Sequence, residues 1–202
     1  FLSLLTMAIT SALGACVGLV SGFFRNRIDD VLMRICDVMM SFPSEVMILA
    51  IVGMTGPGLE NVVIANVVAK WPWYARMVRS IVRQYSDKDY IRFAKVAGGS
   101  SIRIMMRHLL PGTAGELFVL TTLDTGSVIL MISALSFLGL GVQPPTPEWG
   151  MMLNEAKEVM TLYPLQMIPA GMAILLVVAA FNFLGDSLRD AFDPKHAGRE
   201  RS

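Results

Sequence analysis

Long runs of apolar residues separated by short polar segments are the dominant pattern along this chain. A membrane-spanning helix needs about 20 mostly apolar residues in succession, so runs of this length predict spans rather than helices of a water-soluble core. The runs that reach this length are Phe1–Phe24, Val38–Leu59, Val62–Val82, Gly112–Val142 and Val159–Gly185. The pattern therefore predicts an all-α, polytopic transmembrane helical bundle with five spans, forming one domain over residues 1–202.

The first run carries no charge and places Gly14, Gly18 and Gly22 at four-residue spacing. Small residues at this interval allow two helix backbones to approach closely in lipid, although simple permissiveness explains the glycines equally well. The run begins at Phe1 without a methionine, a charged n-region or a cleavage site. We therefore expect an N-terminal piece to be missing and do not interpret the run as a signal peptide.

Composition supports the membrane assignment. Hydrophobic residues make up 54% and charged residues 16% of the chain, whereas soluble domains carry about 25% charged residues. The net charge of +1 and the many apolar residues fit neither disorder nor nucleic-acid binding. Cys16 and Cys36 lie in or beside apolar runs without CxxC spacing, which excludes a disulfide framework and a zinc knuckle.

The lysines and arginines orient the spans, because cytoplasmic loops carry an excess of both. Basic residues gather between the first two spans, at or after the third span, and in the tail: Arg25, Arg27, Arg34; Arg76, Arg79, Arg83, Lys88, Arg92, Lys95, Arg103, Arg107; Arg189, Lys195, Arg199, Arg201. Five alternating spans place these three groups on one side, whereas the other side holds Lys157 and a span contains Lys70. We expect the basic side, and with it the C-terminus, to be cytoplasmic.

The longest polar stretch, Gln84–Pro111, predicts two short amphipathic helices around a glycine turn. Asp87 and Asp89 lie where a helix start favours acidic residues. Two apolar stripes flank Gly98–Ser101, and Leu110-Pro111 is expected to end the element. Two interpretations remain open from composition: a knob that a partner protein grips, or a helix pair lying on the membrane surface.

Several motifs together resemble a known family. In the polar stretch, Ala94, Gly98 and Leu110-Pro111 match a pattern of Glu-Ala-Ala, a glycine and a later Leu-Pro. Further agreement comes from Ser41-Phe42-Pro43, Trp73–Ser80, Leu135–Gly150, Gly185–Asp190 and Asp193-Pro194. On these residues nearly the whole chain resembles the permeases of binding-protein-dependent ABC importers, in their dipeptide/oligopeptide/nickel branch. Trp73–Ser80, Leu123–Gly126 and Pro164–Met167 look most like the nickel type.

The resemblance implies a type I ABC importer permease fold of six helices, with the first helix and the following outer loop absent here. It also implies that residues 84–111 form the cytoplasmic loop that couples the permease to an ATPase. The residues that would do so are Asp89, Arg92, Phe93, Ala94, Gly98, Gly99, His108, Leu110 and Pro111. Arg92 stands where the family has glutamate, and Phe93 replaces the first alanine, so a modified contact is expected.

The resemblance further implies a transport subunit and not an enzyme, located in the bacterial inner membrane. Its partners would be a homologous second permease, two cytoplasmic ATPase subunits, an extracytoplasmic substrate-binding protein and the lipid bilayer. The sequence has no GxxxxGK[ST] motif, so ATP and Mg²⁺ are expected on the ATPase and no cofactor on this chain.

The nickel-type motifs predict nickel or a nickel chelate as cargo. A di- or oligopeptide, or another metallophore or opine, is the alternative within the family. A secondary transporter driven by ion gradients is the alternative of a different class, although no inverted repeat is evident between the spans. A membrane enzyme would need a catalytic constellation, which the sequence lacks.

Glu45, Lys70, Glu116 and Asp124 lie inside predicted spans, where a charge costs about 2.5–3.5 kcal/mol. Either Lys70 forms a structural ion pair with a carboxylate and Glu45 snorkels or caps a helix, or these residues line a path that attracts cationic cargo. Eight residues separate Glu116 and Asp124, about 80° around a helix, so one cavity could receive both. Met131 joins the candidate path, with core packing as its alternative. We assign no metal ligands, and we do not expect His108 to bind metal.

Overall fold

The computed structural model describes residues 1–192, which are helical apart from turns and connecting segments. The long helices are α1 (Leu2–Phe24), α4 (Leu59–Ser86), α7 (Leu110–Phe137) and α9 (Met167–Phe192). The shorter helices are α2 (Arg27–Met40), α3 (Ser44–Thr55), α5 (Asp89–Val96), α6 (Ser101–Ile104) and α8 (Trp149–Glu158). The all-α prediction is confirmed for this part of the chain. Asp193-Pro194, Lys195, Arg199 and Arg201 lie outside the described residues.

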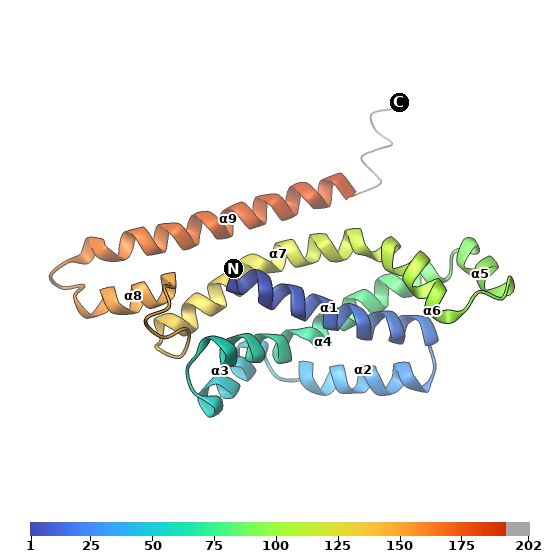
Figure 1. The fold of residues 1–202 in the computed structure, drawn as a ribbon, viewed down its shortest axis with the longest axis horizontal. Coiled ribbons are helices and arrows are strands. Elements are labelled where there is room, and N and C mark those ends of the chain that lie inside the picture. The colour runs from blue at the N-terminus through green and yellow to red at the C-terminus, as the bar shows by residue number, and fades with distance from the viewer. Residues whose placement is uncertain (193–202) are drawn as a thin grey trace.

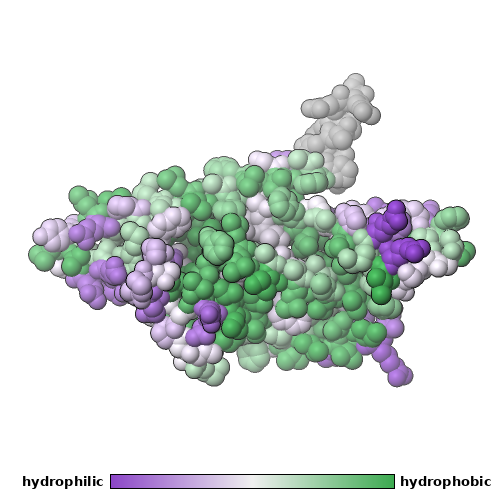
Figure 2. Space-filling view, in the orientation of Figure 1, coloured by the Kyte–Doolittle hydropathy of each residue, from purple (hydrophilic) through white to green (hydrophobic). Residues whose placement is uncertain are grey.

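The long helices run side by side along the longest axis of the molecule (Figure 1). Helices α5 and α6 lie at one end of this bundle, and α3 and α8 lie toward the other. Apolar surface covers the middle of the view in Figure 2, and hydrophilic residues gather toward both ends. This distribution is typical of a protein whose central zone lies in lipid.

The glycine stripe of α1 packs directly against α4. A Cβ atom at Gly18 would lie 2.6 Å from the carbonyl oxygen of Ala75, and one at Gly22 would lie 2.8 Å from Cγ1 of Val82. Both distances are shorter than van der Waals contact, so only glycine permits this approach. The close packing of two backbones is therefore confirmed, and it fixes the position of α4 against α1.

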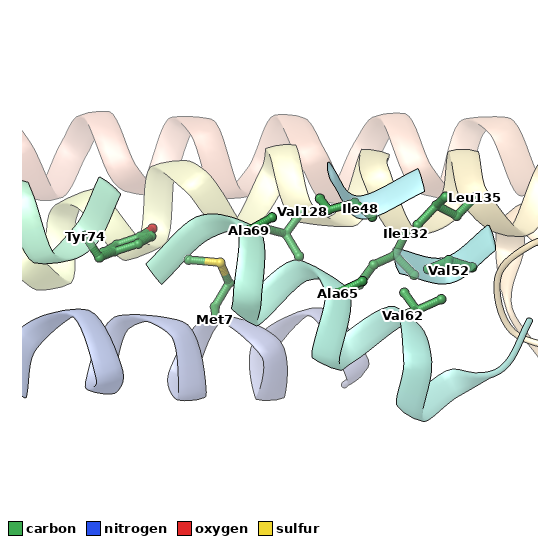
Figure 3. Close-up of a cluster of buried hydrophobic side chains, with 10 residues drawn as sticks. All are labelled: Met7, Ile48, Val52, Val62, Ala65, Ala69, Tyr74, Val128, Ile132 and Leu135. Atoms are coloured by element: carbon green, nitrogen blue, oxygen red, sulfur yellow. The ribbon is translucent and has the colours of Figure 1, made fainter. Parts of the chain in front are cut away.

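Two clusters of buried side chains hold the bundle together. The first joins α1, α3, α4 and α7 (Figure 3) and consists of Met7, Ile48, Val52, Val62, Ala65, Ala69, Tyr74, Val128, Ile132 and Leu135. The second joins α1 and α4 to the polar stretch and consists of Ala15, Leu19, Val78, Val82, Ile91, Ile104 and Leu109. The second cluster attaches the polar stretch firmly to the bundle.

The predicted span Val38–Leu59 is wrong in its first part, because the chain bends there. Helices α2 and α3 meet at an angle of 79°. Pro43 precedes α3, and a proline both lacks an N–H donor and disfavours helical geometry at the residue before it. Helix α2 is amphipathic, begins at the Asn26 cap and carries charges along one face.

The predicted spans at Gly112–Val142 and Val159–Gly185 also have shifted ends. Helix α7 stops at Phe137, and Gly139 follows with a φ of +79°, which takes the chain out of helical geometry. Helix α9 starts at Met167, because the chain turns at 159–163 and forms one 3₁₀ turn at Pro164–Gln166. The intervening helix α8 was not predicted.

Three helical stretches have the length and apolar character to cross a membrane: Leu2–Phe24, Ser101–Phe137 and Pro164–Phe192. The bent α2–α3 pair makes a fourth if it counts as one span. Helix α4 has 28 residues, but Lys70 and the arginines near its C-terminal end make it less apolar. The count of five spans, which includes α4, stays a prediction.

Candidate functional site

A cavity of about 450 Å³ lies between the α2–α3 bend, α4 and α7. It is lined by Met40, Phe42, Pro43, Ser44, Glu45, Ala69, Lys70, Trp73, Tyr74, Asp124 and Ser127. We call it the charged pocket, because three charged side chains contribute to its wall. Those three, Glu45, Lys70 and Asp124, are among the residues that the sequence predicts for a cargo path.

Lys70 and Asp124 form an ion pair in the wall of the charged pocket. The Lys70 ammonium donates hydrogen bonds to both carboxylate oxygens of Asp124, at 2.7 and 2.9 Å, and the Tyr74 hydroxyl donates a third at 3.1 Å. The Lys70 and Asp124 side chains keep 17% and 21% of their surface exposed, so a ligand in the pocket can reach them.

Helix α4 positions both side chains that bind the Asp124 carboxylate. Lys70 and Tyr74 are four residues apart and therefore lie on one face of the helix, toward α7. Tyr74 is fully buried, and its ring lies edge-on to that of Trp73 at 5.0 Å between centroids. The hydroxyl of Tyr74 thus has a fixed position from which it orients the Asp124 carboxylate.

Glu45 contributes to the charged pocket from α3 and is itself exposed. It lies in the first turn of α3, immediately after the bend, where a carboxylate interacts favourably with the helix N-terminus. Among residues 1–192, no cation forms an ion pair with Glu45. Its carboxylate is therefore available to a ligand without breaking a protein contact.

The structure does not bring Glu116 and Met131 to the charged pocket. Glu116 accepts a hydrogen bond of 3.4 Å from the hydroxyl of Tyr85, and Met131 packs against the first buried cluster. Eight residues rotate a helix by about 80° but also advance it by about 12 Å. This advance along the axis separates the two carboxylates, and the charged pocket therefore includes Asp124 but not Glu116.

A second ionic cluster lies between α1, α2 and α4 and was not predicted. The Asp29 side chain is almost fully buried, and it accepts hydrogen bonds from Arg79 at 2.5 and 2.7 Å and from Arg83 at 2.6 Å. The Ser21 hydroxyl also donates to it. In the sequence, Arg79 and Arg83 indicate only which end of the span faces the cytoplasm. No sequence motif links them to Asp29, which lies 50 and 54 positions away.

The polar stretch forms two helical segments around a glycine turn, as the sequence predicts, but only α5 is a separate short helix, because α6 continues into α7. Helix α5 has Asp89 in its first turn, and Ser100 caps α6 by accepting a hydrogen bond from the Arg103 amide. Gly98 has a φ of +79°, a conformation that few residues other than glycine adopt. A Cβ at Gly99 would lie 2.8 Å from the Ala94 carbonyl oxygen, so this position also requires glycine.

The expectation that Leu110-Pro111 ends the element is wrong. The helix runs without interruption from Ser101 to Phe137. A π-helical turn at Met105–Leu109 precedes the proline, and the Leu110 amide bonds to the Met105 carbonyl, one residue further back than in an α-helix. Pro111 follows directly at the start of α7, and the wider turn before it shifts the hydrogen-bond register at the point where proline has no N–H to donate.

One face of the two short helices is buried and the other is open. Ile91, Ile104 and Leu109 pack in the second buried cluster. Outward-facing apolar side chains are 58–87% exposed and form what we call the loop face: Phe93, Val96, Ile102 and Met106. Exposed apolar side chains gathered at the tip of a loop are typical of a protein-protein contact.

The predicted coupling residues occupy distinct places around the loop. Asp89, Arg92, Phe93 and Gly98 are exposed at its tip. The others are partly buried or lie at its base: Ala94, Gly99, His108, Leu110 and Pro111. The His108 ring lies 6.4 Å from that of Tyr90, measured between centroids.

Arg25 joins the loop to the end of α1. Its guanidinium donates to Asp87 at 2.8 and 3.1 Å and to the Arg83 carbonyl at 2.6 Å. The hydrogen bond from Arg25 holds the pKa of the Asp87 carboxyl below its usual range. Asp87 closes α4, so it does not start the next helix as the sequence suggested.

Comparison with known proteins identifies the family. The model of the family described as "Binding-protein-dependent transport system inner membrane component" matches residues 14–197, which include both the charged pocket and the loop. Similar proteins include the metal-staphylopine import system permease protein CntC of Staphylococcus aureus, with 44% identity over 86% of this chain and 60% of that protein. The nickel transport system permease protein NikC of Escherichia coli is 40% identical over 93% of this chain and 68% of its own length.

The glutathione transport system permease protein GsiD of Escherichia coli is 44% identical over 94% of this chain and 63% of its own length. The chain thus spans about 60–68% of the length of these relatives. The family match nevertheless covers most of the chain described above. The chain belongs to the family of binding-protein-dependent transport system inner membrane components.

Proposed function

We propose that this chain is the transmembrane permease subunit of an ATP-driven, binding-protein-dependent importer that passes nickel or a nickel chelate into the cell. The observation that carries the proposal is the family match over residues 14–197. The relatives named for nickel and for metal-staphylopine transport support a metal-containing cargo. The relative named for glutathione transport supports the alternative, a peptide-like cargo.

The loop face supports a contact with a cytoplasmic ATPase. Phe93, Val96 and Ile102 expose apolar surface at the end of a rigid helix pair, while its other side is fixed to α1 and α4. Because the loop is packed against α1 and α4, a movement of a partner bound to its exposed face would be transmitted to the helices of the bundle. This favours the partner-docking interpretation of the loop over a helix pair lying on the membrane surface.

The mechanism that follows is alternating access, in which two conformations of the bundle expose the cargo path to opposite sides in turn. The complex would contain a homologous second permease, two ATPase subunits that hold ATP and Mg²⁺, and an extracytoplasmic binding protein that delivers the cargo. The chain would lie in the inner membrane with its C-terminus in the cytoplasm. It would form and break no covalent bond.

Uptake into proteoliposomes tests the proposal. The complete importer, purified with its ATPase and binding protein, should take up Ni²⁺ or a Ni²⁺–histidine complex only when ATP is present on the ATPase side. An imposed proton or sodium gradient without ATP should drive no uptake. Uptake driven by a gradient and indifferent to ATP would instead favour a secondary transporter. A complex that takes up glutathione but neither nickel probe would favour the peptide-like cargo.

A further inference from the structure

We propose that the charged pocket binds cargo that carries a carboxylate and a positive charge in one molecule, and that it does so by exchanging partners with the Lys70–Asp124 ion pair. This inference rests on the proposed function and adds the substrate class. Amino-carboxylate metal chelates and short peptides both belong to that class, whereas a bare metal ion does not.

Charged side chains of both signs line the cavity. One ammonium, from Lys70, and two carboxylates, from Asp124 and Glu45, line the same cavity. Lys70 and Asp124 satisfy each other at 2.7 Å, while Glu45 forms no ion pair within residues 1–192. The pocket therefore presents both signs of charge to a ligand, with one carboxylate already free.

A bare cation is a poor fit to this arrangement. Among residues 1–192 no group of three or more histidine, cysteine, aspartate or glutamate side chains is placed to hold a metal ion. The ammonium of Lys70 also lies against the Asp124 carboxylate and repels a second cation from it. A metal would therefore meet one free carboxylate only, too few donors to replace its water shell.

A ligand that carries both charges gives Lys70 a new anionic partner and gives the two pocket carboxylates one cationic group to share. Its carboxylate can take the place of Asp124 beside Lys70, and its cationic group can then pair with Asp124 and Glu45. Removing one partner from a low-dielectric ion pair is strongly unfavourable, but exchanging it for another of the same sign is not. One ion pair within the protein thus becomes two pairs with the ligand.

Tyr74 makes the exchange feasible as a positioning residue. Its buried hydroxyl donates to Asp124 at 3.1 Å, so the carboxylate keeps one hydrogen bond and its orientation when Lys70 moves away. Trp73, Phe42 and Pro43 supply an apolar wall for the rest of the ligand. A volume of about 450 Å³ lies in the range of about 300–1,000 Å³ that small-molecule sites occupy.

Equilibrium binding to the permease–ATPase complex in nanodiscs, without the binding protein, tests this directly. The probes are glutathione, a Ni²⁺–histidine complex and Ni²⁺ alone, each followed by radiolabel. We expect at least one of the two carboxylate-bearing probes to bind more tightly than Ni²⁺ alone. Lys70→Gln should weaken that binding about tenfold or more, because it removes a charged hydrogen-bond donor.

A second variant distinguishes a loss of binding from misfolding of the Lys70→Gln variant. Lys70→Met combined with Asp124→Asn removes both charges of the pair, and it should also lose binding by about tenfold. Lys157→Gln is the matched control, because this ammonium lies on α8 over the Phe137 ring, outside the pocket. The control should bind every probe as the wild type does.

Three results would overturn the inference: binding of Ni²⁺ alone at least as tight as both other probes, no binding of either carboxylate-bearing probe, or wild-type affinity in the double variant. None of these depends on ATP-driven uptake. A wild-type complex that binds the probes as expected but shows no ATP-dependent uptake would instead contradict the proposed function.

Discussion

The ammonium of Lys70 on α4 lies 2.7 Å from Oδ1 of Asp124 on α7, although 54 residues separate the two in the chain. The pair joins two neighbouring long helices of the bundle, and it also forms part of a cavity wall. It therefore has two roles that mutations can separate, one in the stability of the complex and one in contact with cargo.

The stability role predicts the behaviour of Asp124→Asn. Removing one partner from a buried ion pair costs about 3–5 kcal/mol, and the partial exposure of this pair should bring the cost below that range. We expect a lower melting temperature of the purified complex, measured by fluorescence-detected size-exclusion chromatography after heating. Adding Lys70→Met should restore most of the loss, because no charge is then left without a partner.

Asp186→Asn provides the control for this pair of variants, since Asp186 is exposed on α9 and forms no ion pair among the described residues. It should melt with the wild type. Equal melting of Asp124→Asn and the wild type would show that the pair contributes nothing to stability.

The contact of α1 with α4 predicts a strong effect at a single glycine. Gly18→Ala would place a methyl group 2.6 Å from the Ala75 carbonyl oxygen, and such overpacking costs about 1–3 kcal/mol. We expect lower accumulation in the membrane and a lower melting temperature. Gly53→Ala is the control, because a Cβ there meets no atom within 4 Å. If both alanines behave alike, the close approach of the two helices is not required.

The backbone conformation at Gly98 predicts that a proline there uncouples the loop from the ATPase. Its φ of +79° is inaccessible to proline, and its amide donates a hydrogen bond of 3.1 Å to the Lys95 carbonyl that proline would remove. Gly98→Pro should therefore insert into the membrane but lose the ATPase activity that loaded binding protein stimulates. Gly98→Asn should retain most of it, because asparagine tolerates left-handed geometry. Full stimulation in the proline variant would argue against a coupling role for the loop.

The features that sequence predicted correctly have local signals. The loop follows from Asp89 at a helix start, a Gly-Gly turn and two apolar stripes, all within one stretch of chain. The glycine stripe of α1 has a fixed spacing that indicates a close helix contact. In each case the residues that matter are neighbours in the sequence or along one helix face.

The features that sequence missed depend on distant residues or on bends. The length of an apolar run says nothing about the 79° turn at Pro43, nor about the boundary between α8 and α9. The partner of Lys70 lies 54 positions away, so composition left both Asp124 and Glu116 as candidates. Tyr74 was within reach of prediction, because its place four residues after Lys70 puts both on one face of a helix.

The distribution of basic residues predicts the orientation of the chain in the membrane. Of the 17 lysines and arginines, all but Lys70 and Lys157 lie at or beyond the ends expected in the cytoplasm, and basic loops face that side. In a background lacking Cys16 and Cys36, a cysteine at exposed Thr146 should react with a membrane-impermeant thiol reagent added to spheroplasts. A cysteine at Ser101, which is also exposed but lies beside the loop face, should react only after permeabilisation. Because both sites are open to water, a lack of labelling reports the membrane barrier and not burial in the protein. The reverse pattern would invert the bundle and place the loop face where no cytoplasmic ATPase could reach it.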